Sequence, residues 1–439
     1  MDRVVVVGAG PAGLAAAWAA ASVGAPVLLV DSGTAVGGQY RRQSGVRAAR
    51  VPAHPLVEWW PETSVWAAEP VAGGHRLRLQ TGAADAPGRT MSTVDTRALV
   101  IATGAYDRVL PFPGWELPGV YTAGAAQALA KGQGVAVGRR VLVGGTGPFL
   151  LPVAGSLLEV GSRVVGLVEA NRVAGAMGWA RDPLGALGKA GELAGYGAVL
   201  ARGRVPVRFG AAVVAAHGDS RVAAVTVARL DAGWRVVAGS ERVVEVDAVC
   251  LGFGFTAQLE LAVSAGCRIE DGAVLVDAAQ RTSVPGVFAA GEVTGIAGAG
   301  PASAEGTVAG CAAAARLGRA VAAPVAALRL ARDGRRFGRA LAAAYPVRKG
   351  WRTWLSADTV VCRCEEVRMS DLCAAVAQGA LGMRAVKLVS RAGLGLCQGR
   401  VCGRNVGELT GTPFTQNRPI AVPVRLSDLA AVEDEEELS

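Results

Sequence analysis

Residues 4–13 read Val-Val-Val-Val-Gly-Ala-Gly-Pro-Ala-Gly, an apolar β-branched run followed at once by glycines in the spacing G-x-G-x-x-G. Four consecutive valines are typical of a parallel strand that is buried on both faces. The Ala-rich segment 14–21 favours a helix, and the apolar run 27–30 predicts a second strand that ends at Asp31. This order of strand, glycine turn, helix and strand is the context in which the motif indicates a dinucleotide site.

Each glycine of the motif has its own physical task. Gly8 permits the tight turn, Gly10 lets the backbone approach a pyrophosphate, and Gly13 allows the helix to pack closely on the strand. The N-terminus of the helix offers N–H groups and a positive dipole to the phosphates. Asp31, 18 residues after Gly13, is placed to accept hydrogen bonds from an adenosine ribose.

A second, altered copy of this unit begins near residue 140. A short apolar strand leads into Gly-Gly-Thr-Gly-Pro-Phe-Leu, residues 144–150, and a later strand ends at an acid, Glu169. Leu150 occupies the position of Gly13, which should push the helix off the strand and reshape the phosphate site. Binding of an adenine nucleotide, productive binding of NAD(P)H and a scaffolding role all stay open. The candidate ligand residues of this second site are Gly145, Gly147 and Glu169.

Four of the eight cysteines are paired near the C-terminus, as Cys362-Arg363-Cys364 and Cys397-x4-Cys402. Two cysteines one residue apart cannot easily close on each other, but both thiolates can point at one metal centre. Two such pairs form the ligand set of a [2Fe–2S] cluster. A structural zinc site uses the same ligands, usually with Cys-x2–4-Cys twice, so zinc and no metal remain as alternatives. The scattered cysteines are expected to be small buried core residues: Cys250, Cys267, Cys311 and Cys373.

Length and composition favour a large intracellular globular protein. The 439 residues suggest about three domains, and 51% hydrophobic residues allow a large core. The pI of about 9.5 comes from arginine spread thinly along the chain, so nucleic-acid binding is not expected. Residues 4–30 carry no charge, as a signal peptide or membrane span would, but the glycines and Asp31 favour the nucleotide-binding interpretation. We therefore expect no transmembrane segment and a cytoplasmic chain.

Later segments resemble the two-dinucleotide flavoproteins that include thioredoxin reductases. The resemblance rests on Gly37-Gly38-Gln39, on the strand 99–105 with its Ala-Thr-Gly, and on the strand 287–292 with Gly291-Glu292, and it covers residues 1–320. It implies FAD in the first unit, with the second unit inserted into the first. Glu292 stands where the family usually has aspartate. The residues that this resemblance and the motif assign to FAD are Gly8, Gly10, Pro11, Ala12, Gly13, Asp31, Ser32, Gly38, Gln39, Ala102, Thr103, Gly104, Gly291 and Glu292.

The cysteine segment 397–402, Cys-Gln-Gly-Arg-Val-Cys, resembles the bacterioferritin-associated-ferredoxin type of [2Fe–2S] module. Together with segments 102–120 and 145–148, the chain is similar to the α subunits of heteromeric amine and imino-acid dehydrogenases, a group with opine oxidases, hydroxyproline dehydrogenases and hydrogen cyanide synthase. The partner that this similarity implies is a catalytic flavoprotein β subunit. A small ferredoxin-like subunit is a further candidate partner, and FMN at the interface between subunits is a candidate cofactor.

The expected fold is α/β, with two Rossmann-like dinucleotide-binding domains, one inserted in the other, and a small, mostly helical C-terminal [2Fe–2S] domain. The expected boundaries are 1–130 and 251–325 for the FAD-binding domain, 136–250 for the second nucleotide-binding-like domain, 326–355 for a linker, 356–415 for the iron–sulfur domain and 416–439 for a solvated tail.

The expected function is that of a flavin and iron–sulfur electron-transfer subunit of an amine, opine or imino-acid dehydrogenase. No Cys-x-x-Cys lies between residues 130 and 250, so a thiol–disulfide relay is not expected. The alternatives are a self-contained NAD(P)H-dependent reductase and a structural assembly subunit. Catalytic residues stay unknown, because His54, His75 and His217 lie apart without a motif; Tyr40, Arg41 and Tyr106 follow flavin-contacting turns and are weak candidates for ligand contact.

Overall fold

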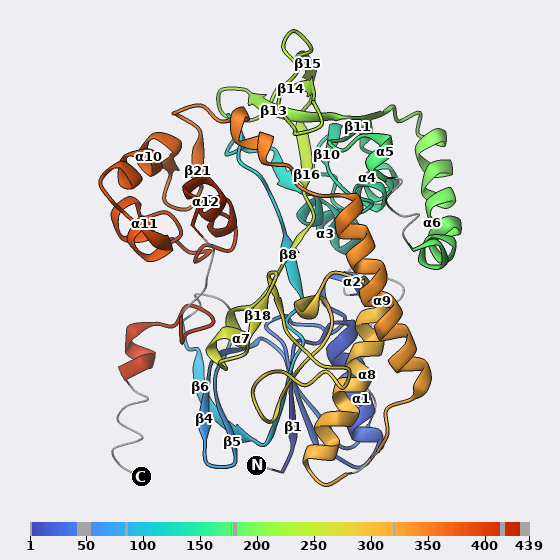
Figure 1. The fold of residues 1–439 in the computed structure, drawn as a ribbon, viewed down its shortest axis with the longest axis vertical. Coiled ribbons are helices and arrows are strands. Elements are labelled where there is room, and N and C mark those ends of the chain that lie inside the picture. The colour runs from blue at the N-terminus through green and yellow to red at the C-terminus, as the bar shows by residue number, and fades with distance from the viewer. Residues whose placement is uncertain are drawn as a thin grey trace. The chain divides into compact units, whose positions relative to one another are not determined.

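The computed structural model describes residues 2–41, 54–83, 87–176, 178, 182–319, 321–412 and 418–430. The chain divides into two compact units, each built from separate stretches (Figure 1). Unit 1 comprises Met1–Ala105, Ala257–Gly338 and Gln416–Ser439, and unit 2 comprises Tyr106–Thr256 and Arg339–Thr415. The finer domain boundaries expected from the sequence stay predictions.

Unit 1 is centred on a five-stranded parallel sheet in the order β20-β7-β1-β2-β3. The inner strands are fully buried, which explains their continuous runs of Val, Leu, Ile and Ala. The strands are β1 (Val4–Val7), β2 (Val27–Val30), β3 (Val57–Trp60), β7 (Ala98–Ile101) and β20 (Val287–Ala289).

Two helices of small residues, α1 (Pro11–Ser22) and α8 (Ala299–Arg316), lie side by side over one face of this sheet (Figure 1). A Cβ atom added at Gly306 of α8 would lie 2.0 Å from the carbonyl oxygen of Ala12 in α1. The two backbones are therefore in direct contact, which only glycine permits at this position.

The opposite face packs on an antiparallel sheet of β4 (Thr63–Val71), β5 (Gly74–Thr81) and β6 (Thr90–Thr96). The segment after residue 417 lies against this sheet, where the Ala421 N–H donates to the Trp66 carbonyl at 2.6 Å. The remaining elements that begin in this unit are α2 (Gly38–Arg41), α7 (Glu260–Ser264), β18 (Ile269–Glu270), β19 (Ala273–Val274), η3 (Glu292–Thr294) and α9 (Val325–Ala344).

Unit 2 repeats the parallel arrangement, with the strand order β12-β11-β10-β16-β9. Its strands are β9 (Val120–Thr122), β10 (Arg140–Gly145), β11 (Arg163–Glu169), β12 (Val207–Phe209) and β16 (Ala248–Gly252), and its helices here are α3 (Ala123–Gln133), α4 (Leu150–Glu159), α5 (Val173–Ala176) and α6 (Pro183–Arg202). The antiparallel strands β13 (Ala211–His217), β14 (Ala224–Arg229) and β15 (Arg242–Glu245) form a second sheet. The strands β8 (Ala105–Asp107) and β17 (Phe255–Ala257) pair with each other.

The paired cysteines belong to a small, mostly helical module of unit 2 with a core of its own. Its elements are β21 (Val360–Cys362), β22 (Val367–Arg368), α10 (Met369–Ala377), α11 (Gly382–Ser390) and α12 (Gly403–Thr410), preceded by η4 (Lys349–Trp354). Helix α12 is fixed to the rest of unit 2, because Glu408 pairs with the buried Arg108 at 2.6 Å and accepts from Trp351 Nε1 at 3.3 Å. Asn405 Nδ2 also donates to the Val109 carbonyl at 2.9 Å.

No single helix among the described residues has both the length and the hydropathy to cross a membrane; α10 and α11 reach them only as a pair bent by 120°.

Candidate functional site

The first glycine turn is shaped by backbone contacts that exclude side chains. Gly8 has φ +104°, and a Cβ atom there would lie 2.3 Å from the Ala102 carbonyl oxygen. A Cβ at Gly13 would lie only 1.7 Å from the Gly8 carbonyl oxygen, whereas one at Gly10 would have no neighbour closer than Gly38 Cα at 4.0 Å. The turn is therefore closed around Gly8 and Gly13 and open at Gly10, which suits close approach of a phosphate group.

Asp31 braces this turn from the end of β2. Its two carboxylate oxygens accept from the N–H groups of Ala9 and Gly33, both at 2.7 Å. The same residue lines a cavity of about 100 Å³ in unit 1. Five of the other lining residues are Gly8, Ser32, Thr63, Ser64 and Thr103, and two come from the far end of the chain, Ala421 and Val422.

The expected acidic residue after β20, Glu292, is half-buried, and burial raises the pKa of its carboxyl group. Within the described residues its carboxyl group has no hydrogen-bond partner, which leaves it available to a ligand. The loop that carries it is held by Glu305 of α8, whose Oε2 accepts from the Gly291 N–H at 2.9 Å and the Thr294 hydroxyl at 2.7 Å. Arg335 pairs with the other oxygen of Glu305 at 3.2 Å.

The other residues assigned to the first site lie on the same edge of the unit 1 sheet. Pro11 and Ala12 form the first turn of α1, and Gly38 and Gln39 begin α2. Thr103 and Gly104 follow β7, where the Thr103 hydroxyl donates to the Gln258 carbonyl at 2.8 Å. The sequence reasoning missed Glu305, Thr63 and Ser64. Glu305 alone left a signal, as a single carboxylate in a helix of small residues.

The second glycine turn is closed by its own acid. Glu169 is 4% exposed, and its carboxylate accepts from the Thr146 hydroxyl at 2.6 Å, the Gly147 N–H at 2.8 Å and the Asn171 N–H at 2.9 Å. Burial raises its pKa, partly offset by these hydrogen bonds. Helix α4 begins at the buried Leu150, three residues after Gly147, whereas α1 begins directly after Gly10. The structure thus begins the second helix later in its motif than the first, while the expected displacement of this helix from its strand stays a prediction.

The four paired cysteines come together as a chain of contacts. Cys402 hydrogen-bonds both Cys362 and Cys397, and Cys397 also contacts Cys364. The Gly393 N–H donates to Cys362 Sγ at 3.5 Å. Among the described residues no three His, Cys, Asp or Glu side chains surround a common point as a ready metal site.

The same contacts give the four thiols different pKa values. The hydrogen bond from Cys402 is the main cause that lowers the pKa of Cys362 to about 6 and that of Cys397 to about 4. The Cys402 pKa is raised, chiefly because its proton is shared with Cys362. Burial raises the pKa of Cys364. The geometry therefore favours two thiolates that flank one protonated thiol, a set that could hold a cationic metal centre once the protons leave.

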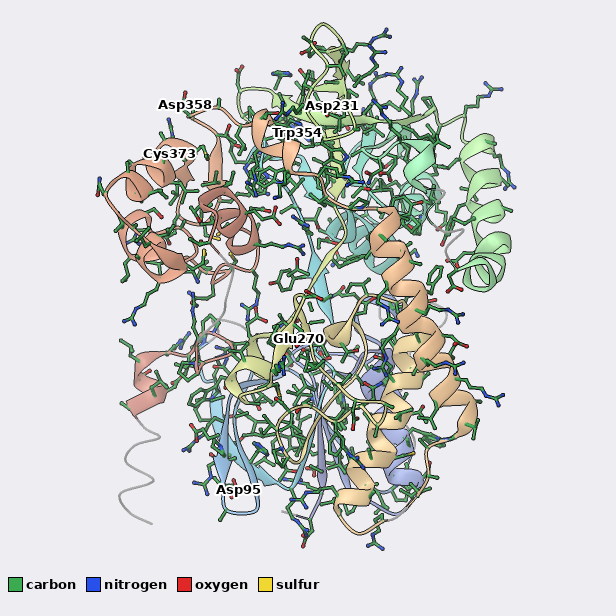
Figure 2. The ribbon with its side chains drawn as sticks, viewed as in Figure 1. Asp95, Asp231, Glu270, Trp354, Asp358 and Cys373 are labelled. Carbon is green, nitrogen blue, oxygen red and sulfur yellow. The ribbon has the colours of Figure 1, made fainter. Side chains whose placement is uncertain are left out.

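The unpaired cysteines are not all core residues. Cys250, Cys267 and Cys311 are buried, as expected. The expectation for Cys373 was wrong, because it is exposed on α10 (Figure 2). The buried face of α10 is formed by Leu372 and Ala375, one helical turn apart, and the adjacent position 373 points about 100° away from Leu372.

The weak candidates for catalysis do not converge. His75 is buried in β5, where burial lowers its pKa, and His217 pairs with Thr226 on the neighbouring strand at 2.6 Å. His54 accepts from the Leu56 N–H two residues away. Tyr40 is 66% exposed. These local roles supply no acid–base constellation.

Residues 2–318 match the family described as pyridine nucleotide-disulphide oxidoreductase. The chain is 33% identical over 429 residues to hydrogen cyanide synthase subunit HcnB of Pseudomonas aeruginosa, covering 91% of this chain and 90% of that protein. It is 32% identical over 470 residues to one of the subunits of the opine oxidase of Agrobacterium tumefaciens, covering 97% of this chain and 91% of that protein. The fold is similar to that of L-proline dehydrogenase from P. horikoshii, with a TM-score of 0.66 and 18% identity over 98% of this chain and 79% of the other.

Proposed function

Because the chain belongs to the pyridine nucleotide-disulphide oxidoreductase family, we propose that it is a flavin and iron–sulfur electron-transfer subunit of a heteromeric amine, opine or imino-acid dehydrogenase. Its relatives in hydrogen cyanide synthase and opine oxidase are named as subunits, which supports a heteromeric assembly. FAD would supply two-electron chemistry and a [2Fe–2S] cluster single-electron steps.

The first glycine turn fits FAD. Its backbone is open at Gly10, where the N-terminus of α1 presents N–H groups to phosphate. Asp31 lines the adjoining cavity, and the half-buried Glu292 has a carboxyl group without a protein partner among the described residues. Half-burial removes part of the hydration of this carboxyl group, so a ligand that donates hydrogen bonds to it would stabilise the site.

The thiol chain fits an iron–sulfur cluster better than a disulfide relay. Four sulfurs from two close pairs touch in sequence, and backbone N–H groups of Gly393 and Gly399 favour thiolate at Cys362 and Cys397. The Cys-x-Cys spacing and these N–H donors match what thiolates of a cluster require. Zinc would use the same sulfurs and stays the alternative metal.

In this proposal the substrate is oxidised on a partner subunit. The described residues hold no cluster of acid–base side chains beside the flavin segments, so the hydride would be removed on a catalytic flavoprotein β subunit. The further components proposed are FMN at the interface with the β subunit, and a small ferredoxin-like subunit.

The observation that carries the proposal is the presence in one chain of the open turn at Gly10 and the four linked thiols. The test is anaerobic purification of the chain alone, with measurement of flavin, iron and the paramagnetic signal of the reduced protein. We expect one FAD and two irons per chain, and no rapid oxidation of amines or opines until a β subunit is added. Flavin without iron or signal, or rapid turnover by the chain alone, contradicts the proposal.

A second candidate is a self-contained NAD(P)H-dependent reductase. The intact parallel sheet around β10 and the positive φ of Gly145 and Gly147 favour it. The engaged carboxylate of Glu169 and the buried Leu150 oppose it, because both consume space and donors that a pyrophosphate would need. Anaerobic mixing with NADH or NADPH separates the two, since prompt flavin bleaching supports the reductase.

A further inference from the structure

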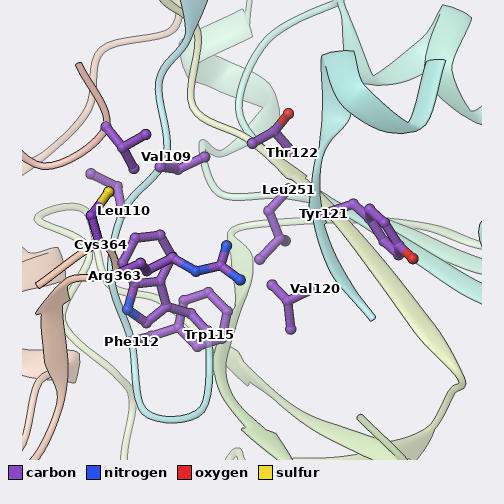
Figure 3. A pocket seen from close by; sticks show the side chains of 11 residues that line it. Val109, Leu110, Phe112, Trp115, Val120, Tyr121, Thr122, Leu251, Arg363 and Cys364 are labelled. Atoms are coloured by element: carbon purple, nitrogen blue, oxygen red, sulfur yellow. The ribbon is translucent and has the colours of Figure 1, made fainter. Parts of the chain in front are cut away.

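Unit 2 contains an apolar cavity of about 110 Å³ beside the first cysteine pair (Figure 3). Its wall is formed mainly by side chains of segment 109–122 of unit 2, and three residues of the cysteine module close it. The apolar lining residues are Val109, Leu110, Phe112, Trp115, Val120, Leu251 and Val401. The polar ones are Tyr121, Thr122, Arg363 and Cys364.

The one cation of this wall is Arg363, whose guanidinium lies 5.0 Å from the centre of the Trp115 ring and extends toward Val120 and Leu251 (Figure 3). One of its nitrogens, Nη2, donates to the Glu116 carbonyl at 3.2 Å. Within the described part of the chain no carboxylate forms an ion pair with it, although Glu116 acts at longer range. An arginine that stacks on an aromatic ring and forms no direct ion pair keeps N–H donors for an anion.

We propose that this cavity binds a small apolar monocarboxylate, with the carboxylate on Arg363 and the hydrocarbon against Trp115 and Leu251. The size follows from the volume, because a cavity of about 150 Å³ accepts the six carbons of benzene. A cavity of about 110 Å³ therefore suits roughly four or five carbons. A branched-chain carboxylate such as isovalerate has four carbons beyond its carboxyl group.

The site adjoins the proposed cluster, since Cys364 belongs to both the cavity wall and the thiol chain. This consequence rests on the proposed function. A bound anion disfavours the extra negative charge of a reduced cluster, so the reduced protein should bind the carboxylate less tightly. A tenfold weaker affinity in the reduced state equals a fall of about 59 mV in the one-electron reduction potential. Binding of a carboxylic acid substrate or product would thus lower the reduction potential of the cluster.

The experiment uses isothermal calorimetry on the full chain with isovalerate, and isovaleramide as the uncharged probe of the same shape. We expect a Kd below about 1 mM for isovalerate and at least about tenfold weaker binding of isovaleramide. Arg363→Gln should weaken isovalerate binding by at least about tenfold. Arg384→Gln on α11 is the matched control, because Arg384 is exposed and touches neither the cavity nor the thiols.

A second variant avoids the cysteine segments. Val120→Phe fills the cavity from β9, so it should abolish binding while iron content stays that of the wild type. Equal affinity for isovalerate and isovaleramide, wild-type affinity in Val120→Phe, or no heat of binding at 20 mM isovalerate (about twenty times the expected Kd) would overturn the site. A reduction potential that does not change in saturating isovalerate would overturn the coupling between carboxylate binding and the cluster. Calorimetry on iron-free protein tests the carboxylate site independently of the proposed function.

Discussion

Gly13→Ala tests whether contact between α1 and β1 sets the first site. The added Cβ would lie 1.7 Å from the Gly8 carbonyl oxygen, and real Cβ contacts stay above about 3.0 Å, so α1 must withdraw by roughly 1.3 Å. A shift of this size breaks hydrogen bonds from the helix N-terminus to a phosphate, since these weaken steeply beyond about 3.2 Å. Loss of one or two charge-assisted bonds costs about 2–4 kcal/mol, or roughly 30- to 1000-fold in FAD affinity.

The assay is fluorescence titration of deflavinated protein with FAD, together with urea unfolding. The matched control is Gly195→Ala on α6, where an added Cβ meets nothing within 4 Å. It should leave FAD affinity unchanged and stabilise the helix by about 0.5–1 kcal/mol. A Gly13→Ala protein that binds FAD as tightly as the wild type would refute the reasoning, because close packing would then not fix the phosphate site.

Three further outcomes are expected. Burial raises the pKa of Glu292. The stability of the flavin-free protein should therefore be highest below the ordinary glutamate pKa and decline as the pH rises through the raised value. Urea midpoints measured across this pH range should show a smaller decline in Glu292→Gln than in the wild type. Cys397→Ser should lose iron but keep FAD, while Cys373→Ser, in the same module, keeps both; unchanged iron in the first contradicts the ligand set. Glu408→Gln leaves the buried Arg108 without its charge partner and should lower the free energy of unfolding by about 3–5 kcal/mol, a claim that a midpoint equal to the wild type would disprove.

Local pattern was sufficient for much of the fold. The run Val4–Val7, its glycine turn and the helix after it are specified by neighbours in sequence, and the structure has them as β1, the open turn and α1. Leu150 in place of glycine indicated an altered turn, and α4 begins later in its motif than α1 does.

Contacts between distant segments could not be anticipated in this way. The turn-closing role of Glu169 depends on how its longer side chain reaches back to Gly147, which spacing alone does not determine. Glu305 acquires its partners only when α8 packs on the loop after β20. Cys373 shows the opposite error, since a small apolar residue next to a buried position was assigned to the core although the helix turns it outward.

The wall of the cavity beside Asp31 combines residues that are synthesised at very different times during translation. Gly8 and Asp31 leave the ribosome early, whereas Ala421 and Val422 are synthesised only after the whole of the inserted domain and the cysteine module. A growing polypeptide therefore presents this cavity with one side missing. A nucleotide can therefore be fully enclosed there only when translation is nearly complete. A truncated chain that lacks these residues would differ from the full-length protein in its affinity for the cofactor.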